Sequence, residues 1–166
     1  AFGAVVNSQG RLQQVFGSNG IVTITPVIGS NAGFDNNYSQ SLAIAPDGQS
    51  LFGGGYADFD TDPPYQFVAT KIDAQYGNLI WSALINPVFG TVNGNNGQAH
   101  SVVVNASGTV ILSGYGRNDI DQSRYVIVGV NSLNGELDLA YGGNGTGING
   151  IEQAIIPAGT GDFVNC

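Results

Sequence analysis

Short runs of hydrophobic residues alternate with polar residues along this chain, and most runs end at a glycine turn. In the run 41–45, Leu42 and Ile44 share one face of a strand, because side chains two residues apart point the same way. The run 101–105 is apolar on both faces, as in a strand buried between neighbours. No stretch carries the 3.6-residue apolar stripe of a helix. The pattern therefore predicts an all-β protein.

Two kinds of turn alternate along the chain. The first kind, an Asn or Asp followed by Gly and then Leu, occurs at 7–12, 73–79 and 131–137, and the second kind contains Gly48, Gly108 and Gly159. Each kind recurs about every sixty residues, with four strands per repeat, which predicts four-stranded antiparallel propeller-like units. We expect the glycines of both turns to adopt positive φ, as tight hairpins require.

The alternating turns also predict how the units are distributed over the single repeat domain, residues 1–166. Units are expected at 29–90 and 91–148, and a further unit is split between 149–166, its first half, and 1–28, its second half. Two or three such units are too few to close a ring, and open strand edges invite pairing.

The split unit therefore predicts assembly with further copies of the chain by strand complementation, as a ring or a filament. Strands near 2–6 are expected to pair with strands near 162–166, within or between subunits. The expected assembly residues are Phe2, Val5, Val6, Phe163, Val164 and Cys166.

The turns of the first kind belong to longer motifs. In 131–145, Asn131, Gly135, Leu137 and Asp138 precede Tyr-Gly-Gly-Asn-Gly. In 7–23, an Asn, a Gly and a Leu in the same order precede Phe-Gly-Ser-Asn-Gly and a β-branched strand. These segments resemble the delta-60 repeat, a β-propeller-type repeat of bacterial surface and secreted proteins. The resemblance implies a fold and no agreed activity.

The middle copy of the motif departs from this pattern. It has Ile80 in place of the Asp, and it lacks the aromatic-Gly-x-Asn-Gly element after Trp81. The strand Arg of the repeat is Lys71 in this copy, and Val5 and Gly129 stand at that position in the other two.

Composition narrows the classes of function. The net charge is −8, and the fixed cations are Arg11, Lys71, Arg117 and Arg124, which are too few for a nucleic-acid or anionic-membrane surface. No apolar run approaches the roughly 18 residues of a membrane span. Scarce Lys with abundant Gly, Asn, Ser and Thr is typical of an extracellular or cell-surface protein. The single cysteine, Cys166, excludes an intrachain disulfide and could either cross-link subunits or stay unpaired.

One acidic run is a candidate metal site. Asp58, Asp60 and Asp62 alternate in the loop between two strands and could offer oxygen ligands to calcium. The run lacks the Gly and the distal Glu of a full calcium loop, so a solvated loop is the competing interpretation. We expect no cofactor and no calcium dependence.

No catalytic constellation can be drawn from the sequence. His100 is the single histidine, and no nucleophile motif or carboxylate pair accompanies it, so we expect a packed strand residue and no enzyme activity. Trp81 and the tyrosines could stack on sugars, although Tyr56, Tyr115, Phe67 and Tyr125 occupy matching repeat positions and are expected in the core. The sequence thus predicts a non-enzymatic extracellular structural or adhesion subunit, and the alternative is a small oligomeric lectin that binds surface glycans between its units.

Overall fold

The computed structural model describes residues 2–24, 34–59, 65–85, 96–117, 123–141 and 151–155, and these residues form strands and turns without a helix. The strands are β1 (Phe2–Ala4), β2 (Ile21–Thr23), β3 (Phe34–Ile44), β4 (Ser50–Phe59), β5 (Tyr65–Asp73), β6 (Leu79–Ile85), β7 (Asn96–Val104), β8 (Thr109–Arg117), β9 (Ser123–Asn131) and β10 (Ile151–Ile155). The predicted all-β class is confirmed.

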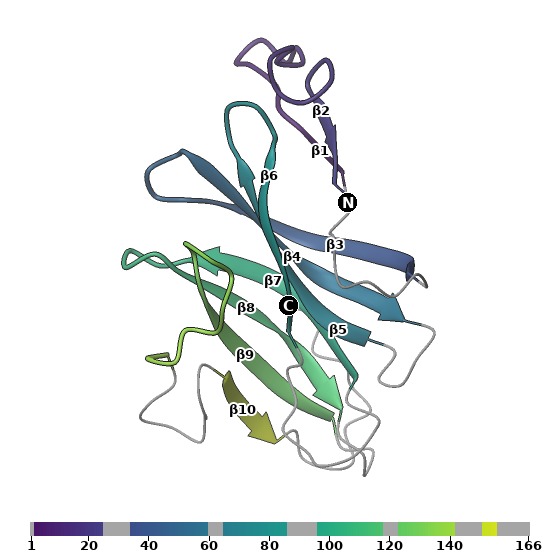
Figure 1. The fold of residues 1–166 in the computed structure, drawn as a ribbon, viewed down its shortest axis with the longest axis vertical. Coiled ribbons are helices and arrows are strands. Elements are labelled where there is room, and N and C mark those ends of the chain that lie inside the picture. Colours follow the sequence, from purple (N-terminus) through teal and green to yellow (C-terminus); the bar gives the residue numbers. More distant parts are fainter. Residues whose placement is uncertain are drawn as a thin grey trace.

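The strands form two four-stranded sheets and one two-stranded pair. The first sheet has the order β3-β4-β5-β6, the second has the order β10-β9-β8-β7, and β1 pairs with β2. All neighbouring strands are antiparallel. Along the longest axis of the molecule, the β1–β2 pair lies at one end, the first sheet follows, and β10 lies toward the other end (Figure 1).

The main hydrophobic core lies between the two four-stranded sheets. Phe52 and Phe67 of the first sheet are buried together with Val102, Leu112 and Val128 of the second. The close approach of β7 to β4 depends on Gly54 in β4, because a Cβ at this position would lie 2.9 Å from the Cβ of Val102. The glycine thus lets β7 pack directly onto the face of the first sheet.

The two sheets repeat each other in register. Tyr56 pairs with Phe67 in the first sheet, and Tyr115 pairs with Tyr125 at the matching place in the second. Both sheets carry an irregularity at the same position of their opening strand, at Gln40 and at His100. The two four-stranded sheets therefore share one pairing register.

The turn glycines behave as predicted. Positive φ is found at Gly10, Gly48, Gly77, Gly108 and Gly135. In the three turns of the first kind, the side-chain Oδ1 of the opening residue accepts a hydrogen bond from the backbone N–H two residues later, at Asn7, Asp73 and Asn131. This Asx geometry explains why each of these turns opens with Asn or Asp.

One predicted boundary differs from the structure. Ile151 was expected to open the first half of the split unit, whereas β10 forms the edge of the second sheet, with Ile151 opposite Val128. After Leu137 bridges Val130, the chain leaves the sheet in a turn at 139–141 and a later segment supplies the fourth strand. In the first sheet, the fourth strand β6 follows its turn directly. Nothing in the sequence indicates that the second sheet takes its fourth strand from a later segment.

The N-terminal pair matches the second half of a four-stranded sheet. Val6 bridges Leu12 as Val130 bridges Leu137. Two residues before each bridge, Ala4 lies opposite Ile21 in the same way that Val128 lies opposite Ile151. The β1–β2 pair therefore has the same register relative to its bridge as the β9–β10 pair.

Candidate functional site

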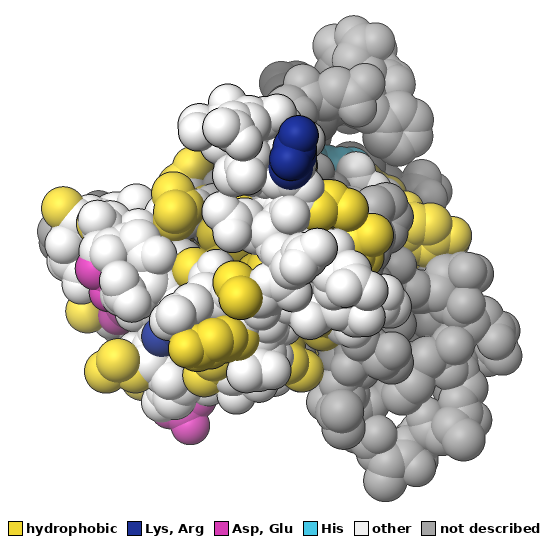
Figure 2. All heavy atoms as spheres, turned by 90° about the horizontal axis from the view of Figure 1, so that it is seen from above, with side chains coloured by type: hydrophobic (Ala, Val, Ile, Leu, Met, Phe, Trp, Pro, Cys, Tyr) yellow, Lys and Arg dark blue, Asp and Glu magenta, His cyan; other side chains and the backbone are white. Residues whose placement is uncertain are grey.

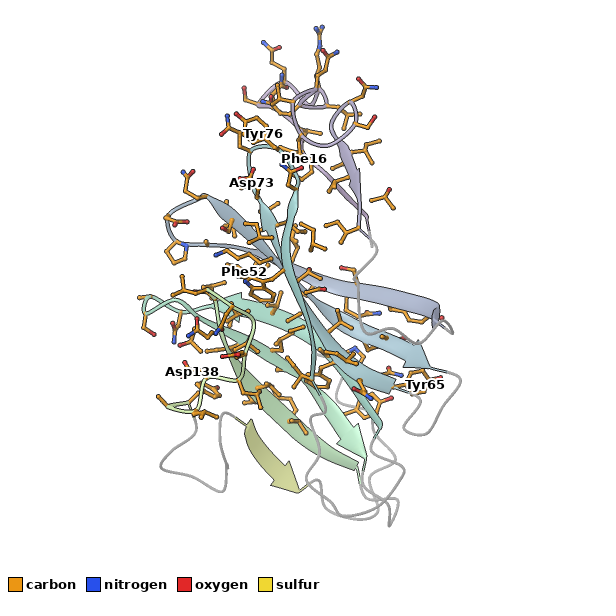
Figure 3. The ribbon with its side chains drawn as sticks, viewed as in Figure 1. Phe16, Phe52, Tyr65, Asp73, Tyr76 and Asp138 are labelled. Atoms are coloured by element: carbon orange, nitrogen blue, oxygen red, sulfur yellow. The ribbon has the colours of Figure 1, made fainter. Side chains whose placement is uncertain are left out.

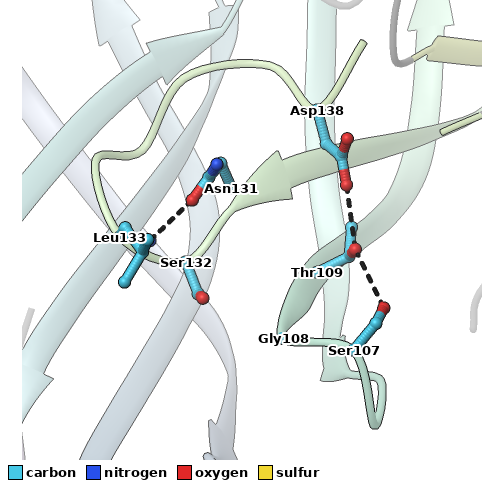
Figure 4. A pocket seen from close by; sticks show the side chains of 7 residues that line it. All are labelled: Ser107, Gly108, Thr109, Asn131, Ser132, Leu133 and Asp138. Atoms are coloured by element: carbon cyan, nitrogen blue, oxygen red, sulfur yellow. Dashed lines mark hydrogen bonds between the residues drawn. The ribbon is translucent and has the colours of Figure 1, made fainter. Parts of the chain in front are cut away.

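An open groove lies where the two four-stranded sheets meet at their turns. Its larger part, about 310 Å³, is lined by residues of the Gly48 and Gly108 turns together with Phe52, Lys71, Ser132 and Leu133. A second part of about 270 Å³ shares Ser107, Gly108, Ser132 and Leu133 and extends to Thr109, Asn131 and Asp138 (Figure 4). The groove is thus bordered by turns of both kinds.

Lys71 and Trp81 fix the floor of the groove to the second sheet. The Lys71 Nζ donates a hydrogen bond to the backbone oxygen of Ser132 at 3.0 Å, and the Trp81 Nε1 donates to the same oxygen at 3.1 Å. The ammonium also lies 5.5 Å from the centre of the Phe52 ring. Lys71 therefore joins the first sheet to a turn of the second through the Ser132 carbonyl, and its ammonium lies over the Phe52 ring of its own sheet.

A hydroxyl and carboxylate network lines the other part of the groove. The Thr109 hydroxyl donates to Asp138 Oδ2 at 2.9 Å, and Ser107 Oγ lies 3.4 Å from Thr109 Oγ1 (Figure 4). Asp138 Oδ1 accepts the backbone N–H of Ala140, and the Ser107 hydroxyl donates to Asn105 Oδ1. The carboxylate thus orders a turn and holds the Thr109 hydroxyl.

His100 lies in β7, away from this network. Its ring stacks on Tyr115 with centroids 5.7 Å apart, which fits the expected packed strand residue. Among the four aromatic residues expected in the core, Phe67 is fully buried, whereas Tyr56, Tyr115 and Tyr125 are half-buried. The prediction of a core position is confirmed for Phe67. The three tyrosines are only partly in the core, because they lie toward the ends of their strands.

A small aromatic cluster lies at the other end of the first sheet. Tyr38 stacks on Tyr56 at 4.7 Å between centroids, and Tyr65 meets Tyr56 edge-on at 5.7 Å. Figure 3 places Tyr65 far from Asp138. The aromatic cluster and the hydroxyl-lined groove are therefore separate features.

The acidic run falls mostly beyond the described residues. Asp58 lies in β4, opposite Asn36 of β3 and Tyr65 of β5, while Asp60 and Asp62 lie outside the described ranges. Within the part of the chain that the structure describes, no three His, Cys, Asp or Glu side chains gather as metal ligands. The calcium hypothesis stays a prediction.

The expected assembly residues divide in the same way. Phe2 lies in β1, and Val5 and Val6 continue that segment, where Val5 N–H donates to the oxygen of Gly20. Phe163, Val164 and Cys166 lie outside the described ranges. The expected pairing of 2–6 with 162–166 therefore stays a prediction.

At the N-terminal end, the sequence predicts the open strand edge and does not predict the exposed apolar face of β3. In the described ranges β1 pairs with β2 alone, whereas its counterpart β9 pairs with strands on both sides. Leu42 and Ile44 are 57% and 62% exposed, although they share an apolar face. Seen from this end, hydrophobic side chains reach the surface at several places and charged ones are few (Figure 2). The unbroken apolar face of the run 41–45 was the available signal.

Comparison with known proteins assigns no family. No protein-family model matches the chain, and no curated protein matches it. Among the described residues, no helix is long and apolar enough to cross a membrane.

Proposed function

We propose that this protein is a non-enzymatic structural and adhesion subunit of the cell surface or extracellular space, which assembles with further copies of itself by strand complementation. In this arrangement, each four-stranded sheet is a propeller-like unit. The N-terminal pair is then half of a further unit, whose first two strands come from another copy. The unpaired edge of β1, in the described part of the chain, is the observation that carries it.

The exposed apolar face of β3 also supports the proposal that two strands of another copy complete the N-terminal unit. In the second sheet, Val102 and Val104 occupy the positions of Leu42 and Ile44, by register with β8 and β4. Val102 is only 3% exposed, because β7 packs against β3, β4 and β5 of the preceding sheet. A first and second strand beside β1 would cover Leu42 and Ile44 in the same manner.

The order of the elements favours a head-to-tail arrangement. The β1–β2 pair and β10 lie toward opposite ends of the longest axis (Figure 1). Because β10 already belongs to the second sheet, the residues proposed to supply strands to another copy are those that follow Ile155. A head-to-tail contact of this kind gives a ring if its rotation closes and a filament if it does not.

The test uses one backbone N–H on the open edge of β1. Val5 N–H bonds to Gly20, so the alternate residue Ala4 directs its N–H away from β2. Ala4→Pro removes that donor and leaves the β1–β2 bonds in place. Ala4→Val, which keeps the donor, is the matched control.

Mass photometry and electron microscopy should show assemblies for the wild type and Ala4→Val and single chains for Ala4→Pro. Assembly of Ala4→Pro at the wild-type concentration would refute the use of this edge.

The groove between the sheets favours a second candidate function, glycan binding. Its lining combines hydroxyls, an amide and a carboxylate at Ser107, Thr109, Asn131 and Asp138, which are groups that hydrogen-bond sugars. A glycan array tests this function directly. Binding should be weakened by Ser107→Ala, and an array without signal above background would rule the function out.

A further inference from the structure

The three turns of the first kind have the same backbone and different surroundings. We call them the Gly10 turn (7–12), the Gly77 turn (73–79) and the Gly135 turn (131–137). Their glycines have φ of 76°, 77° and 77°. Gly77 and Gly135 are buried, whereas Gly10 is exposed. The difference lies in what covers each turn.

An aromatic side chain of the preceding element covers the Gly77 turn. Phe16, which is 2% exposed, points to the turn that carries Asp73 and Tyr76 (Figure 3). A Cβ at Gly77 would lie 3.3 Å from Phe16 Cε2. Next to it, the Gly17 N–H donates to the oxygen of Tyr76 at 2.8 Å. The N-terminal segment therefore sits on the turn of the first sheet through an aromatic ring and one backbone bond.

An aromatic side chain of the preceding sheet also covers the Gly135 turn. A Cβ at Gly135 would lie 2.9 Å from Trp81 Cε3, and Trp81 Nε1 donates to Ser132 in the same turn. The middle copy lacks the aromatic-Gly-x-Asn-Gly element, and Trp81 in β6 takes its place over the turn. The same contact is thus made twice along the chain, each time from one element to the next.

The Gly10 turn has no such cover in the described part of the chain. No atom lies within 4 Å of the Cβ position of Gly10. Val6 is 57% exposed, while its counterparts Ile72 and Val130 are 6% and 0% exposed. Leu12 and Val15 beside the turn are also exposed. The apolar position of Val6 is therefore buried in two copies of the turn and open in the third.

The side chain that corresponds to Phe16 at the other end is Tyr141. Phe16 N–H donates to the oxygen of Gln13, and Tyr141 N–H donates to the oxygen of Asp138 in the same way. The preceding bonds, from Gln13 to Val5 and from Asp138 to Gly129, also match. Phe16 is followed by Gly17, and Tyr141 is followed by Gly142. Backbone geometry and sequence therefore make Tyr141 the counterpart of Phe16, and the Tyr141 ring itself lies against Gly129 of its own chain.

We propose that Tyr141 of one copy of this chain packs onto the Gly10 turn of a second copy, against Val6 and Leu12. The contact repeats the Phe16–Gly77 contact within the chain, and so it joins the tail of one copy to the head of the next. It rests on the proposed self-assembly and specifies a side-chain contact separate from the β1 edge. Arg11 at the head and Glu136 near the tail carry opposite charges, which favours this pairing.

A photocrosslinking experiment tests the contact. The photoreactive amino acid p-benzoylphenylalanine replaces Tyr141, and light and ¹⁵N-labelled copies are mixed before irradiation. Proteolysis and mass spectrometry should find mixed light–heavy crosslinks between position 141 and the segment 6–12. The same amino acid at Leu133, which is 79% exposed, is the matched control and should give at least tenfold fewer of these crosslinks.

A second variant makes the test independent of how Tyr141 packs in its own chain. Val6→Thr keeps the shape of an exposed residue and should raise the Kd of self-association at least fivefold. Leu133→Ala should change it less than twofold.

Each outcome decides between the two proposals. Mixed crosslinks to 6–12 together with a weakened Val6→Thr support the contact. Assembly that depends on Ala4 but gives no crosslink to 6–12 overturns the contact and leaves strand complementation standing. Crosslinks that are only light–light or heavy–heavy would show that position 141 contacts the Gly10 turn of its own chain. That result would overturn the proposal that a second copy covers this turn. Single chains at all concentrations overturn both proposals.

Discussion

The strands β3 and β7 occupy the same place in their sheets and differ in what lies on them. Leu42 of β3 is 57% exposed, and Val102 of β7, its counterpart, is 3% exposed. Both side chains are apolar and belong to an apolar face of their strand. The first sheet buries β7, and in the proposed assembly the strands of another copy would bury β3 in the same way. The same reasoning separates the open Gly10 turn from the covered Gly77 and Gly135 turns.

The largest expected effect comes from placing a charge on each of the two strands. Val102→Asp should lower the free energy of unfolding by more than about 4 kcal/mol, because it leaves an unpaired carboxylate inside the core. Leu42→Asp should cost less than about 1 kcal/mol in the single chain, where the side chain meets water. Urea unfolding at low protein concentration measures both. Equal losses would show that Leu42 is covered in solution, and the comparison would then fail.

The next effect separates the open turn from a covered one. Gly10→Ala should cost about 1 kcal/mol, the strain of positive φ alone. Gly135→Ala carries the same strain and also drives a methyl group into Trp81, so it should cost about 2–4 kcal/mol in total. The two variants share their backbone conformation, so the difference between them reports the covering aromatic. Equal costs in chemical unfolding would show that Trp81 moves aside freely.

Much of this architecture follows from the sequence. The strands and the positive-φ glycines follow from local rules, because alternation and turn chemistry act over a few residues. The boundary at 148 was misplaced, since the sequence of β10 does not show that it completes the sheet across a connection from Leu137. Such a pairing is long-range, and no local signal encodes it.

The exposed surfaces were harder to foresee than the strands. Leu42 and Ile44 were correctly placed on one face, but the sequence cannot say whether another sheet covers that face. The groove residue Asp138 was noticed as a motif position, and its bond to Thr109 depends on a turn and a strand that are 29 positions apart. Burial and side-chain partners of this kind are set by packing between elements.

A smaller effect concerns the contact that holds the covered turn in place. Lys71 and Trp81 both donate to the Ser132 oxygen, so Lys71→Met alone should cost about 1 kcal/mol and Trp81→Phe a similar amount. The double variant leaves that carbonyl without either donor and should cost more than the sum. A double-mutant cycle measured by thermal or urea unfolding gives the coupling energy. Strict additivity would mean that the two donors do not share the acceptor in solution.

The smallest effect compares two hydroxyl residues at matching positions. Thr109 and Ser50 are each 8% exposed, and they lie opposite Asn131 and Asp73 in the same register. Thr109 donates to Asp138, whereas in the described part of the chain no side-chain hydrogen bond is formed by Ser50. Thr109→Val should therefore cost about 1 kcal/mol, because the carboxylate loses a donor, and Ser50→Ala should be close to neutral.

Thr109→Ser restores the hydroxyl and serves as the control for this pair. It should recover most of the lost stability, because a serine can donate to Asp138 from the same strand position. If Thr109→Val and Thr109→Ser lose equal stability in urea unfolding, the methyl group and not the hydrogen bond supports this turn. If Thr109→Val alone is destabilised, the groove is held open by the Thr109–Asp138 bond. Its shape would then be set by a bond that the first sheet lacks at the matching position.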